Sequence, residues 1–322
     1  HQRPHRGASD VWLTPPEIID AVGPFDLDPC AAPVPRPWPT ADRHITPPDD
    51  GLTAEWAGFV WCNPPFGPEA GRWLDRMAER GWTAPTWPRE YGGGGLNPAE
   101  NAVLQAELRR INARPALFSF GVWMLGPVLL EYANEDQKRE HLPAIIRGEA
   151  RWCQGYSEPG SGSDLVSLQT YGEDKGDHWV VNGSKIWTSY ANKADWIFCL
   201  VRTDATVRKQ EGISFLLIDM KTPGVTVRPI LMLDEDHEVN EVFFDDVRVP
   251  AENLIGEEGQ GYKIALSGLE GGRIGIGAQA VGMARAAFDA ALLYAKERTS
   301  FGKAIFEHQA VQFKLADMAT QI

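Results

Sequence analysis

The spacing of apolar residues after position 96 predicts that the chain enters a helix near Asn97. Asn97 supplies a capping side chain, Pro98 suits the first turn, and Glu100 is placed to bond back to the cap. Apolar side chains then recur on one helix face, at Val103, Leu104, Leu108 and Ile111. The helix should end before Pro115, because a residue that precedes proline is disfavoured in the helical region.

Further helices are predicted on both sides of the middle of the chain. Residues 117–131 are strongly apolar, and a second helical pattern covers about 134–147. Pro143 inside that pattern implies a kink or a break, because proline lacks the N–H of the helical ladder. Long helical patterns return at about 258–297 and 305–322.

Between these helices the period changes to that of β-strands. Two apolar segments, 178–181 and 185–188, flank Asn182 and Gly183, a pair that favours a tight hairpin turn. Short apolar strands separated by Gly, Pro and Asp follow at about 195–202, 213–219, 224–230 and 238–249. Consecutive strands without intervening helices indicate an antiparallel sandwich or barrel.

These patterns predict a mixed α+β chain of four parts. A Pro-rich segment, 1–80, precedes a helical region, 81–150, a β domain, 151–254, and a partial C-terminal helical bundle, 255–322. The first eighty residues hold 14 of the 24 prolines, and no Gly- or Ser-rich linker marks their end. A compact Pro-rich domain would give this change of composition, and so would a spliced or misassembled reading frame.

Composition excludes several classes of protein. Among 322 residues, 43% are hydrophobic and 23% charged, which is ordinary for a globular protein. The net charge of −13 argues against broad binding to nucleic acid or to an anionic membrane, and no apolar run approaches the length of a membrane span. The four cysteines form no CxxC pair and the histidines show no ligand spacing, so we expect a cytoplasmic protein without a metal site.

A loop of small residues carries the clearest candidate chemistry. Residues 154–164 read QGYSEPGSGSD, and such a loop can bring backbone N–H groups and hydroxyls close to a polar planar ligand. Taken alone, the loop could equally be a plain surface turn. The segment KIWTS at 185–189 follows it, and Trp187 taken alone could equally be a core aromatic residue on a strand.

Together these two segments resemble the flavin-binding strands of acyl-CoA dehydrogenases. The sequence WTAPTWPREYGG at 82–93 resembles the family's entry segment, and VFFDDVRVP at 242–250 its β-domain exit strand. RTSFGK at 298–303, with EHQ at 307–309, resembles a segment of its C-terminal helical domain. The resemblance covers about 81–322 in family order and leaves both ends of the family's chain without a counterpart.

The resemblance implies that the chain binds FAD and forms a homo-oligomer. The residues implied to line the flavin or thioester side of the pocket are Gln154, Tyr156, Ser157 and Ser163. Those implied to pack against the isoalloxazine ring or bond to it are Trp187 and Ser189. Those implied to reach the FAD of a neighbouring subunit are Arg298, Phe301 and Gln309.

By the same resemblance the chain would desaturate an acyl-CoA thioester and pass electrons to electron-transfer flavoprotein or a similar acceptor. The reaction needs a carboxylate base for the α-proton. In most of the family that Glu lies beyond the matching segment, and in a minority it directly precedes the Arg that corresponds to Arg273, near the acyl-CoA. That position is Gly272 here, and Glu270, the nearest candidate, is about 200° away around a helix. The sequence therefore predicts an acyl-CoA dehydrogenase of impaired activity.

A second resemblance concerns the first eighty residues. The segments DVWLTPPE at 10–17, FDLDPCAA at 25–32 and FVWCNPPFG at 59–67 resemble the start of phage-type DNA N6-adenine methyltransferases. The later parts of that fold have no counterpart, and the negative charge of the fragment does not favour DNA binding.

That resemblance implies a second set of site residues. Asn63 and Pro64 would accept from the adenine amino group, Phe66 after Pro65 would stack on the flipped base, and Asp28 would contact S-adenosylmethionine. Three hypotheses thus stay open: an FAD-dependent acyl-CoA oxidoreductase, a DNA adenine methyltransferase, and an inactive hybrid chain.

Overall fold

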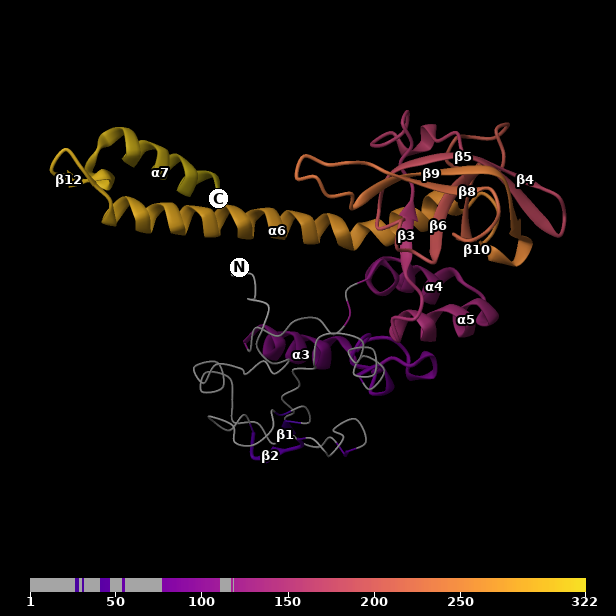
Figure 1. Ribbon diagram of the computed structural model, residues 1–322, viewed down its shortest axis with the longest axis horizontal. Coiled ribbons are helices and arrows are strands. Elements are labelled where there is room, and N and C mark those ends of the chain that lie inside the picture. The colour runs from indigo at the N-terminus through magenta and orange to yellow at the C-terminus, as the bar shows by residue number, and fades with distance from the viewer. Residues whose placement is uncertain are drawn as a thin grey trace. The chain divides into compact units, whose positions relative to one another are not determined.

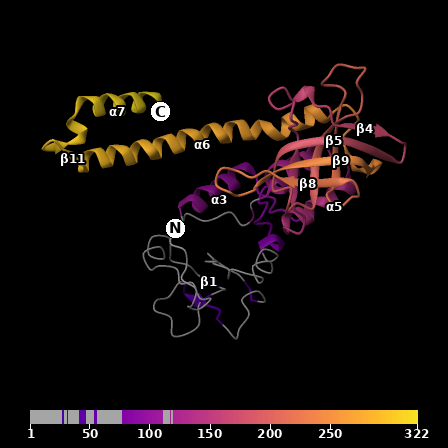
Figure 2. The same ribbon diagram turned by 45° about the horizontal axis from the view of Figure 1, so that its top comes forward.

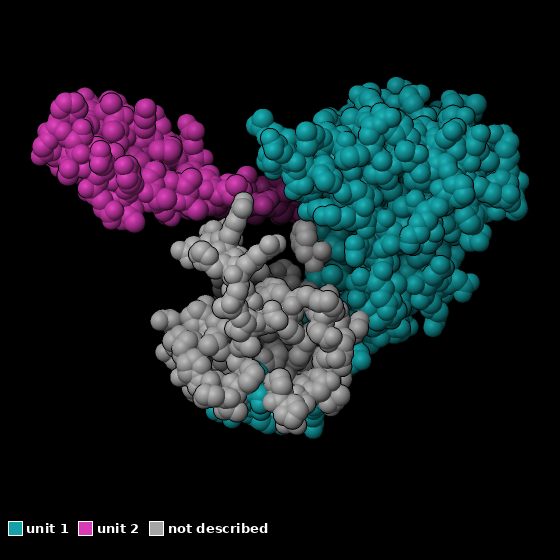
Figure 3. Space-filling view, viewed as in Figure 1, with its two compact units in different colours: residues 1–262 teal, residues 263–322 magenta. Residues whose placement is uncertain are grey.

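The computed structural model describes residues 27–28, 31, 41–46, 54–55, 77–110, 117 and 119–322. The chain forms two compact units, His1–Tyr262 and Lys263–Ile322, which Figure 3 colours separately. Unit 1 contains an eight-stranded sheet and the helices that precede it in sequence (Figure 1). Unit 2 contains most of α6 (Gly261–Glu297) and all of α7 (Gln309–Gln321).

Helix α3 (Pro98–Arg110) begins as the sequence predicts. The Asn97 Oδ1 atom accepts from the backbone N–H groups of Ala99 at 2.9 Å and Glu100 at 3.0 Å. In return, Glu100 Oε2 accepts from the Asn97 backbone N–H at 2.9 Å. This reciprocal capping satisfies N–H groups that the first helical turn would otherwise leave unpaired.

The next helices are a π-helical turn η2 (Gly121–Leu125), α4 (Gly126–Tyr132) and α5 (Glu135–Ile146). Of the kink or break expected at Pro143, the break is wrong, because α5 runs through that residue without interruption. Pro143 lies in the last turn, and its carbonyl oxygen accepts from the Arg147 N–H at 3.1 Å. A proline so near the helix end costs one backbone bond but leaves few residues beyond it to disrupt.

Helix α5 is fixed to the β domain by polar and aromatic contacts. Gln137 Nε2 donates to the carbonyl oxygens of Glu252 at 2.6 Å and Leu254 at 2.8 Å. The buried His141 ring lies 5.5 Å from each of the rings of Trp152 and Trp196, which stack on each other at 5.5 Å.

The His141 contact predicts loss of stability in acid. Burial lowers the pKa of His141 below its ordinary value of 6.5. The unfolded chain therefore binds the proton first, so stability is fully present above about pH 6.5 and falls as pH drops towards the lowered folded pKa. His141→Phe keeps an aromatic ring that does not titrate. The free energy of unfolding, measured with urea, should therefore fall less steeply with decreasing pH in this variant than in the wild type. Equal acid slopes for the variant and the wild type would contradict this.

The sheet of unit 1 is mostly antiparallel, as the sequence predicts, and Figures 1 and 2 show β5 and β9 side by side. Its order is β10-β7-β6-β4-β5-β9-β8, and β3 runs parallel to β6. The strands are β3 (Trp152–Gly155), β4 (Tyr171–Asp174), β5 (His178–Ser189), β6 (Trp196–Arg202), β7 (Ile213–Asp219), β8 (Val225–Pro229), β9 (Val239–Pro250) and β10 (Leu254–Ile255).

The expected hairpin at Asn182 and Gly183 is wrong. Both predicted halves belong to the single strand β5, which pairs with β9 along its length and shifts register between Val181 and Gly183. Asn182 bonds to Asp246 on β9 through its side chain instead of closing a turn. The actual hairpin joins β4 to β5 around Gly176, whose φ of 93° suits glycine.

Buried side chains of the sheet in unit 1 form a hydrophobic core. It includes Trp179, Val181, Cys199, Leu216 and Val242, all 5% exposed or less. Burial raises the pKa of the Cys199 thiol to about 11, so this cysteine stays protonated at neutral pH. Cys153 and Cys199 are free thiols.

Unit 2 consists of α6, the short strands β11 (Thr299–Ser300) and β12 (Lys303–Ala304), the 3-10 turn η5 (Ile305–Glu307) and α7. Across the described ranges, no helix is both long enough and apolar enough to cross a membrane. Near the N-terminus, β1 (Leu27–Asp28) pairs in parallel with β2 (Arg43–His44).

Candidate functional site

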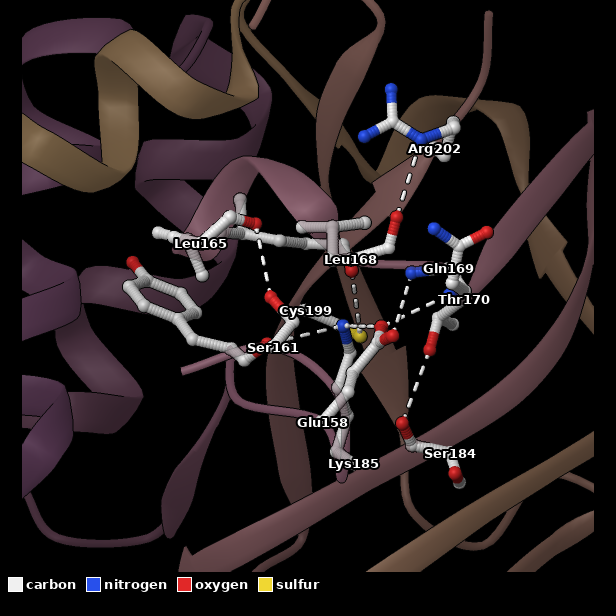
Figure 4. A network of polar contacts seen from close by, with 12 residues as sticks. Glu158, Ser161, Leu165, Leu168, Gln169, Thr170, Ser184, Lys185, Cys199 and Arg202 are labelled. Carbon is white, nitrogen blue, oxygen red and sulfur yellow. Dashed lines mark hydrogen bonds and ion pairs between the residues drawn. The ribbon is translucent and has the colours of Figure 1, made fainter. Parts of the chain in front are cut away.

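The loop of small residues after β3 is held by one buried carboxylate, Glu158 (Figure 4). Glu158 Oε1 accepts from Lys185 Nζ at 2.7 Å and from the Thr170 backbone N–H at 2.9 Å. Glu158 Oε2 accepts from the Gln169 N–H at 2.6 Å. A single side chain thus ties the loop to the two residues that precede β4 and to β5.

Lys185 is the counter-ion of Glu158, and its side chain is 0% exposed. Burial by itself would raise the pKa of the Glu158 carboxyl, but the Lys185 ammonium and the loop's N–H donors outweigh burial and hold that pKa below its ordinary value. Lys185 Nζ also donates to the Tyr156 carbonyl oxygen at 3.3 Å. The pair is therefore buried and hydrogen-bonded on both sides, which is the condition under which two buried charges are tolerated.

The remainder of the loop is closed by hydroxyl and guanidinium donors. Ser161 Oγ donates to the Asp164 carbonyl oxygen at 2.9 Å, and Ser167 Oγ donates to the same oxygen at 2.7 Å. Arg202 from β6 donates to the Val166 carbonyl oxygen at 2.7 Å. The loop's conformation is thus set by bonds within it and by bonds from Lys185 on β5 and Arg202 on β6.

Strand β5 bulges beside this loop. Lys185 pairs with Val242 and Thr188 with Asn240, so β5 has one residue more than β9 over this interval. Trp187 lies in the bulge with a φ of 61° and a side chain that is 60% exposed. The Ile186 N–H donates to the Ser157 carbonyl oxygen at 2.9 Å, which joins the bulge to the loop.

The loop and the bulge together offer groups suited to a planar polar ligand. Within the part of the chain that the structure describes, the hydroxyls of Ser157, Ser163 and Ser189 bond to no other residue. The exposed Trp187 indole adds a flat apolar surface. Free hydroxyls beside an aromatic face fit the ring system of a flavin, which combines both kinds of surface.

Two other residues of the predicted flavin pocket lie at the end of β3 and just after it. Gln154 belongs to β3 and is half-buried. The Tyr156 ring is 7% exposed and packs edge-on against Phe198 at 5.8 Å and Phe215 at 6.4 Å, and burial raises its pKa. The ring of Tyr156 is thus a core group next to Ser157, and its predicted contact with flavin or thioester stays a prediction.

The residues predicted to reach a neighbouring subunit lie together in unit 2. The Arg298 carbonyl oxygen accepts from the Ile305 N–H at 2.8 Å, which closes the β11–β12 hairpin. Phe301 at its tip has a φ of 53°, is 96% exposed, and lies edge-on to His308 at 6.1 Å. Gln309 follows as the first residue of α7 and is exposed.

The other predicted site residues have separate places. Glu270 and Arg273 are exposed on α6. Asp28 is buried in the short strand β1. The methyltransferase-like residues Asn63, Pro64, Pro65 and Phe66 lie outside the described residues. The described ranges contain no cluster of three or more His, Cys, Asp or Glu that could hold a metal.

Sequence reasoning missed the residues that hold this site in shape. Glu158 and Lys185 lie inside the two quoted motifs, but their ion pair joins residues 27 positions apart. The signal available in the sequence was a lysine within an apolar strand pattern. Buried and exposed side chains alternate along a strand, so a lysine would ordinarily be expected on the exposed face.

Models of one protein family match most of the chain. Three family models match: the acyl-CoA dehydrogenase N-terminal domain at 64–149, the middle domain at 153–247, and the C-terminal domain at 259–322. The first match begins inside the segment 1–80, and the comparisons give no support to the methyltransferase resemblance there.

Individual relatives cover the same part of the chain. Acyl-CoA dehydrogenase IpdE1 of Mycobacterium tuberculosis is 42% identical over 68% of this chain and 58% of its own length. The mitochondrial short-chain specific acyl-CoA dehydrogenase of Mus musculus is 38% identical over 76% of this chain and 60% of its own. The solved acyl-CoA dehydrogenase from Geobacillus kaustophilus superposes with a TM-score of 0.65 at 32% identity, over 78% of this chain and 67% of that one.

This chain thus spans about three fifths of the length of these two curated relatives, with 58% and 60% of them covered. The matches follow one order, helical segment, β domain, helical segment, which is also the order of the elements described above. The chain therefore belongs to the acyl-CoA dehydrogenase family.

Proposed function

We propose that the chain binds FAD and acts in the α,β-desaturation of an acyl-CoA thioester. The observation that carries this is that one backbone bond joins the loop to the bulge, and that these two segments carry the unbonded hydroxyls of Ser157 and Ser189 and the exposed Trp187 indole. When bound, FAD supplies the acceptor for the hydride that leaves the substrate's β-carbon. The family membership of the chain supports this choice of cofactor.

The chain's own residues would bind and orient the ring. Trp187 would pack against the isoalloxazine, and the hydroxyls of Ser157 and Ser189 would donate to its polar edge. Ser163 would bond further along the cofactor. The buried pair of Glu158 and Lys185 would keep these groups in place before the cofactor arrives, so that little ordering remains to be done on binding.

The substrate and the partners belong to the same proposal. Arg273 would lie near the acyl-CoA, and Arg298, Phe301 and Gln309 would contact the FAD of a second copy in a homo-oligomer. An electron-transfer flavoprotein or a similar acceptor would take the electrons. The extreme exposure of Phe301, 96%, supports a role that is completed by another chain. Glu270 is exposed on α6, and a role for it as base stays a prediction.

Trp187→Ala should weaken FAD binding about 2- to 10-fold, since one aromatic stacking contact contributes about 0.5–1.5 kcal/mol. Fluorescence titration of the full chain with FAD measures this. Tyr294→Ala is the matched control, because Tyr294 is an aromatic residue of nearly equal exposure, 59%, but lies on α6 outside the loop and the bulge. Equal losses for the two variants would refute the assignment of Trp187.

Turnover is tested separately. The FAD-loaded chain is mixed anaerobically with butyryl-CoA, and loss of the visible flavin band is followed together with formation of the enoyl-CoA. Bleaching with equimolar product supports acyl-CoA desaturation. Stable FAD binding without bleaching by any saturated acyl-CoA would refute the proposed activity and leave cofactor binding intact.

A further inference from the structure

Asn240 on β9 is a buried polar residue that faces the Trp187 bulge across the strand pair. It is 0% exposed, and its partner in register is Thr188. Asn240 Nδ2 donates to the Thr188 carbonyl oxygen at 3.1 Å and to the Glu238 carbonyl oxygen at 3.2 Å. One carboxamide therefore ties the residue after Trp187 to the segment that enters β9.

The backbone that Asn240 ties is strained on both sides. Trp187 has a φ of 61° and Tyr190 a φ of 60°, both in the left-handed region that side chains other than glycine rarely adopt. Such conformations persist only where the surroundings over-determine them. The Tyr190 N–H donates to the same Glu238 carbonyl oxygen, at 2.8 Å. Asn240 thus shares an acceptor with one strained residue, Tyr190, and bonds to Thr188, the residue directly after the other, Trp187.

Packing does not account for an asparagine at this place. Residues 240, 242 and 244 are buried in alternation along β9, and the other two are Val242 and Phe244. Among the described residues, Asn240 Oδ1 and Thr188 Oγ1 are buried without a hydrogen-bond partner. A buried unsatisfied polar atom is destabilising, so an apolar residue would serve the core better. The two bonds from Nδ2 are what the asparagine contributes.

We propose that Asn240 is a positioning residue for the flavin site, one that holds the β5 bulge so that Trp187 and Ser189 are presented to the isoalloxazine ring. This inference rests on the proposed function for the identity of the ligand. Its geometric part, that Asn240 sets the conformation of Trp187, concerns the protein alone and is tested without cofactor.

The test compares Asn240→Ala with Asn182→Ala in the full chain. Asn182 clamps the other bulge of the same strand pair, where its side chain accepts from the Asp246 N–H at 2.9 Å and donates to Asp246 Oδ1 at 3.0 Å. Asn240→Ala should weaken FAD binding about 10-fold, which corresponds to the loss of one stacking contact and one hydrogen bond that each contribute a modest free energy. The fluorescence of bound FAD should also increase. Asn182→Ala should leave both unchanged.

A cofactor-free measurement completes the test. In protein labelled with fluorotryptophan, the fluorine NMR resonance of Trp187 is identified as the one that is missing from the Trp187→Phe variant. That resonance should shift or broaden in Asn240→Ala while the resonances of the remaining tryptophans stay in place. Asn240→Ser, which keeps one donor, should show a smaller change and decides the question if Asn240→Ala does not fold.

Two outcomes would overturn the inference. One is an unchanged Trp187 resonance in a folded Asn240 variant, and the other is an equal loss of FAD affinity in the Asn240 and Asn182 variants. A wild-type chain that binds no FAD would instead overturn the proposed function, and the fluorine spectra would still judge the role of Asn240.

Discussion

Replacing Lys185 by Met should lower the free energy of unfolding by about 3–5 kcal/mol, the usual result of leaving one partner of a buried ion pair without its counter-ion. Glu158 is 6% exposed in its side chain and would keep only the N–H donors of Gln169 and Thr170. The loop that carries Ser157 and Ser163 would lose one of its links to β5 and keep the Ile186 N–H bond to the Ser157 carbonyl oxygen, so FAD affinity should fall as well. Urea unfolding followed by tryptophan fluorescence measures the stability change.

The control is an exposed pair in the same sheet. Arg248 lies 3.0 Å from Asp177 with both side chains mostly exposed, 65% and 74%, so Arg248→Ala should cost less than about 1 kcal/mol. The double variant Glu158→Leu with Lys185→Met should lose less than the sum of its single variants, because no buried charge remains. Equal losses for Lys185→Met and Arg248→Ala would contradict a structural role for the buried pair.

The stability contributed by Glu158 should also depend on pH. Its folded pKa is lowered, so the contribution is present above the unfolded value of 4.5 and is lost as pH falls through the folded pKa. This window lies below that of His141, where loss begins near pH 6.5. The free energy of unfolding of the wild type should therefore fall steeply with decreasing pH over both ranges.

Phe215→Ala should destabilise the chain by about 3–5 kcal/mol, because it opens a cavity at the centre of the sheet. The Phe215 ring is 0% exposed and stacks on Phe198 at 6.0 Å with an interplanar angle of 6°. Tyr156 packs edge-on against both rings, and its neighbour Ser157 belongs to the proposed flavin site. Loss of the ring should thus lower both the unfolding free energy and the affinity for FAD.

Phe243→Ala is the matched control, since Phe243 is a partly exposed residue of β9 that contacts the Arg228 guanidinium at 4.8 Å. Its loss should cost about 1 kcal/mol. Phe215→Leu, which keeps most of the volume, should fall between the two alanine variants. A Phe215→Ala variant as stable as Phe243→Ala would show that the two rings do not form the core contact described above.

Much of the fold could be predicted from local pattern. The apolar runs at 196–202 and 213–219 are strands because nearly every side chain in them is buried, a pattern that needs no partner to be recognised. The Asn97 cap is equally local. The Asn182-Gly183 pair misled because a local turn preference competes with a long ladder to β9, and the ladder determines the structure.

The candidate site, like the fold, could be predicted only where its residues belong to a local sequence pattern. Trp187 and the serines lie in motifs that can be recognised along the chain, and the structure leaves their side chains available. The residues that hold them, Lys185 and Asn240, act on partners 27 and 52 positions away. No periodicity encodes such pairs, because they arise only when strands distant in sequence become neighbours.

The joined loop and bulge of the β domain are proposed to form a flavin site, and titration of the cofactor-free full chain with FAD tests this by the change of the visible flavin spectrum on binding. We expect saturable binding of one FAD per chain, with flavin fluorescence quenched in the wild type and restored in Trp187→Ala. A spectrum identical to that of free FAD at every protein concentration would contradict it.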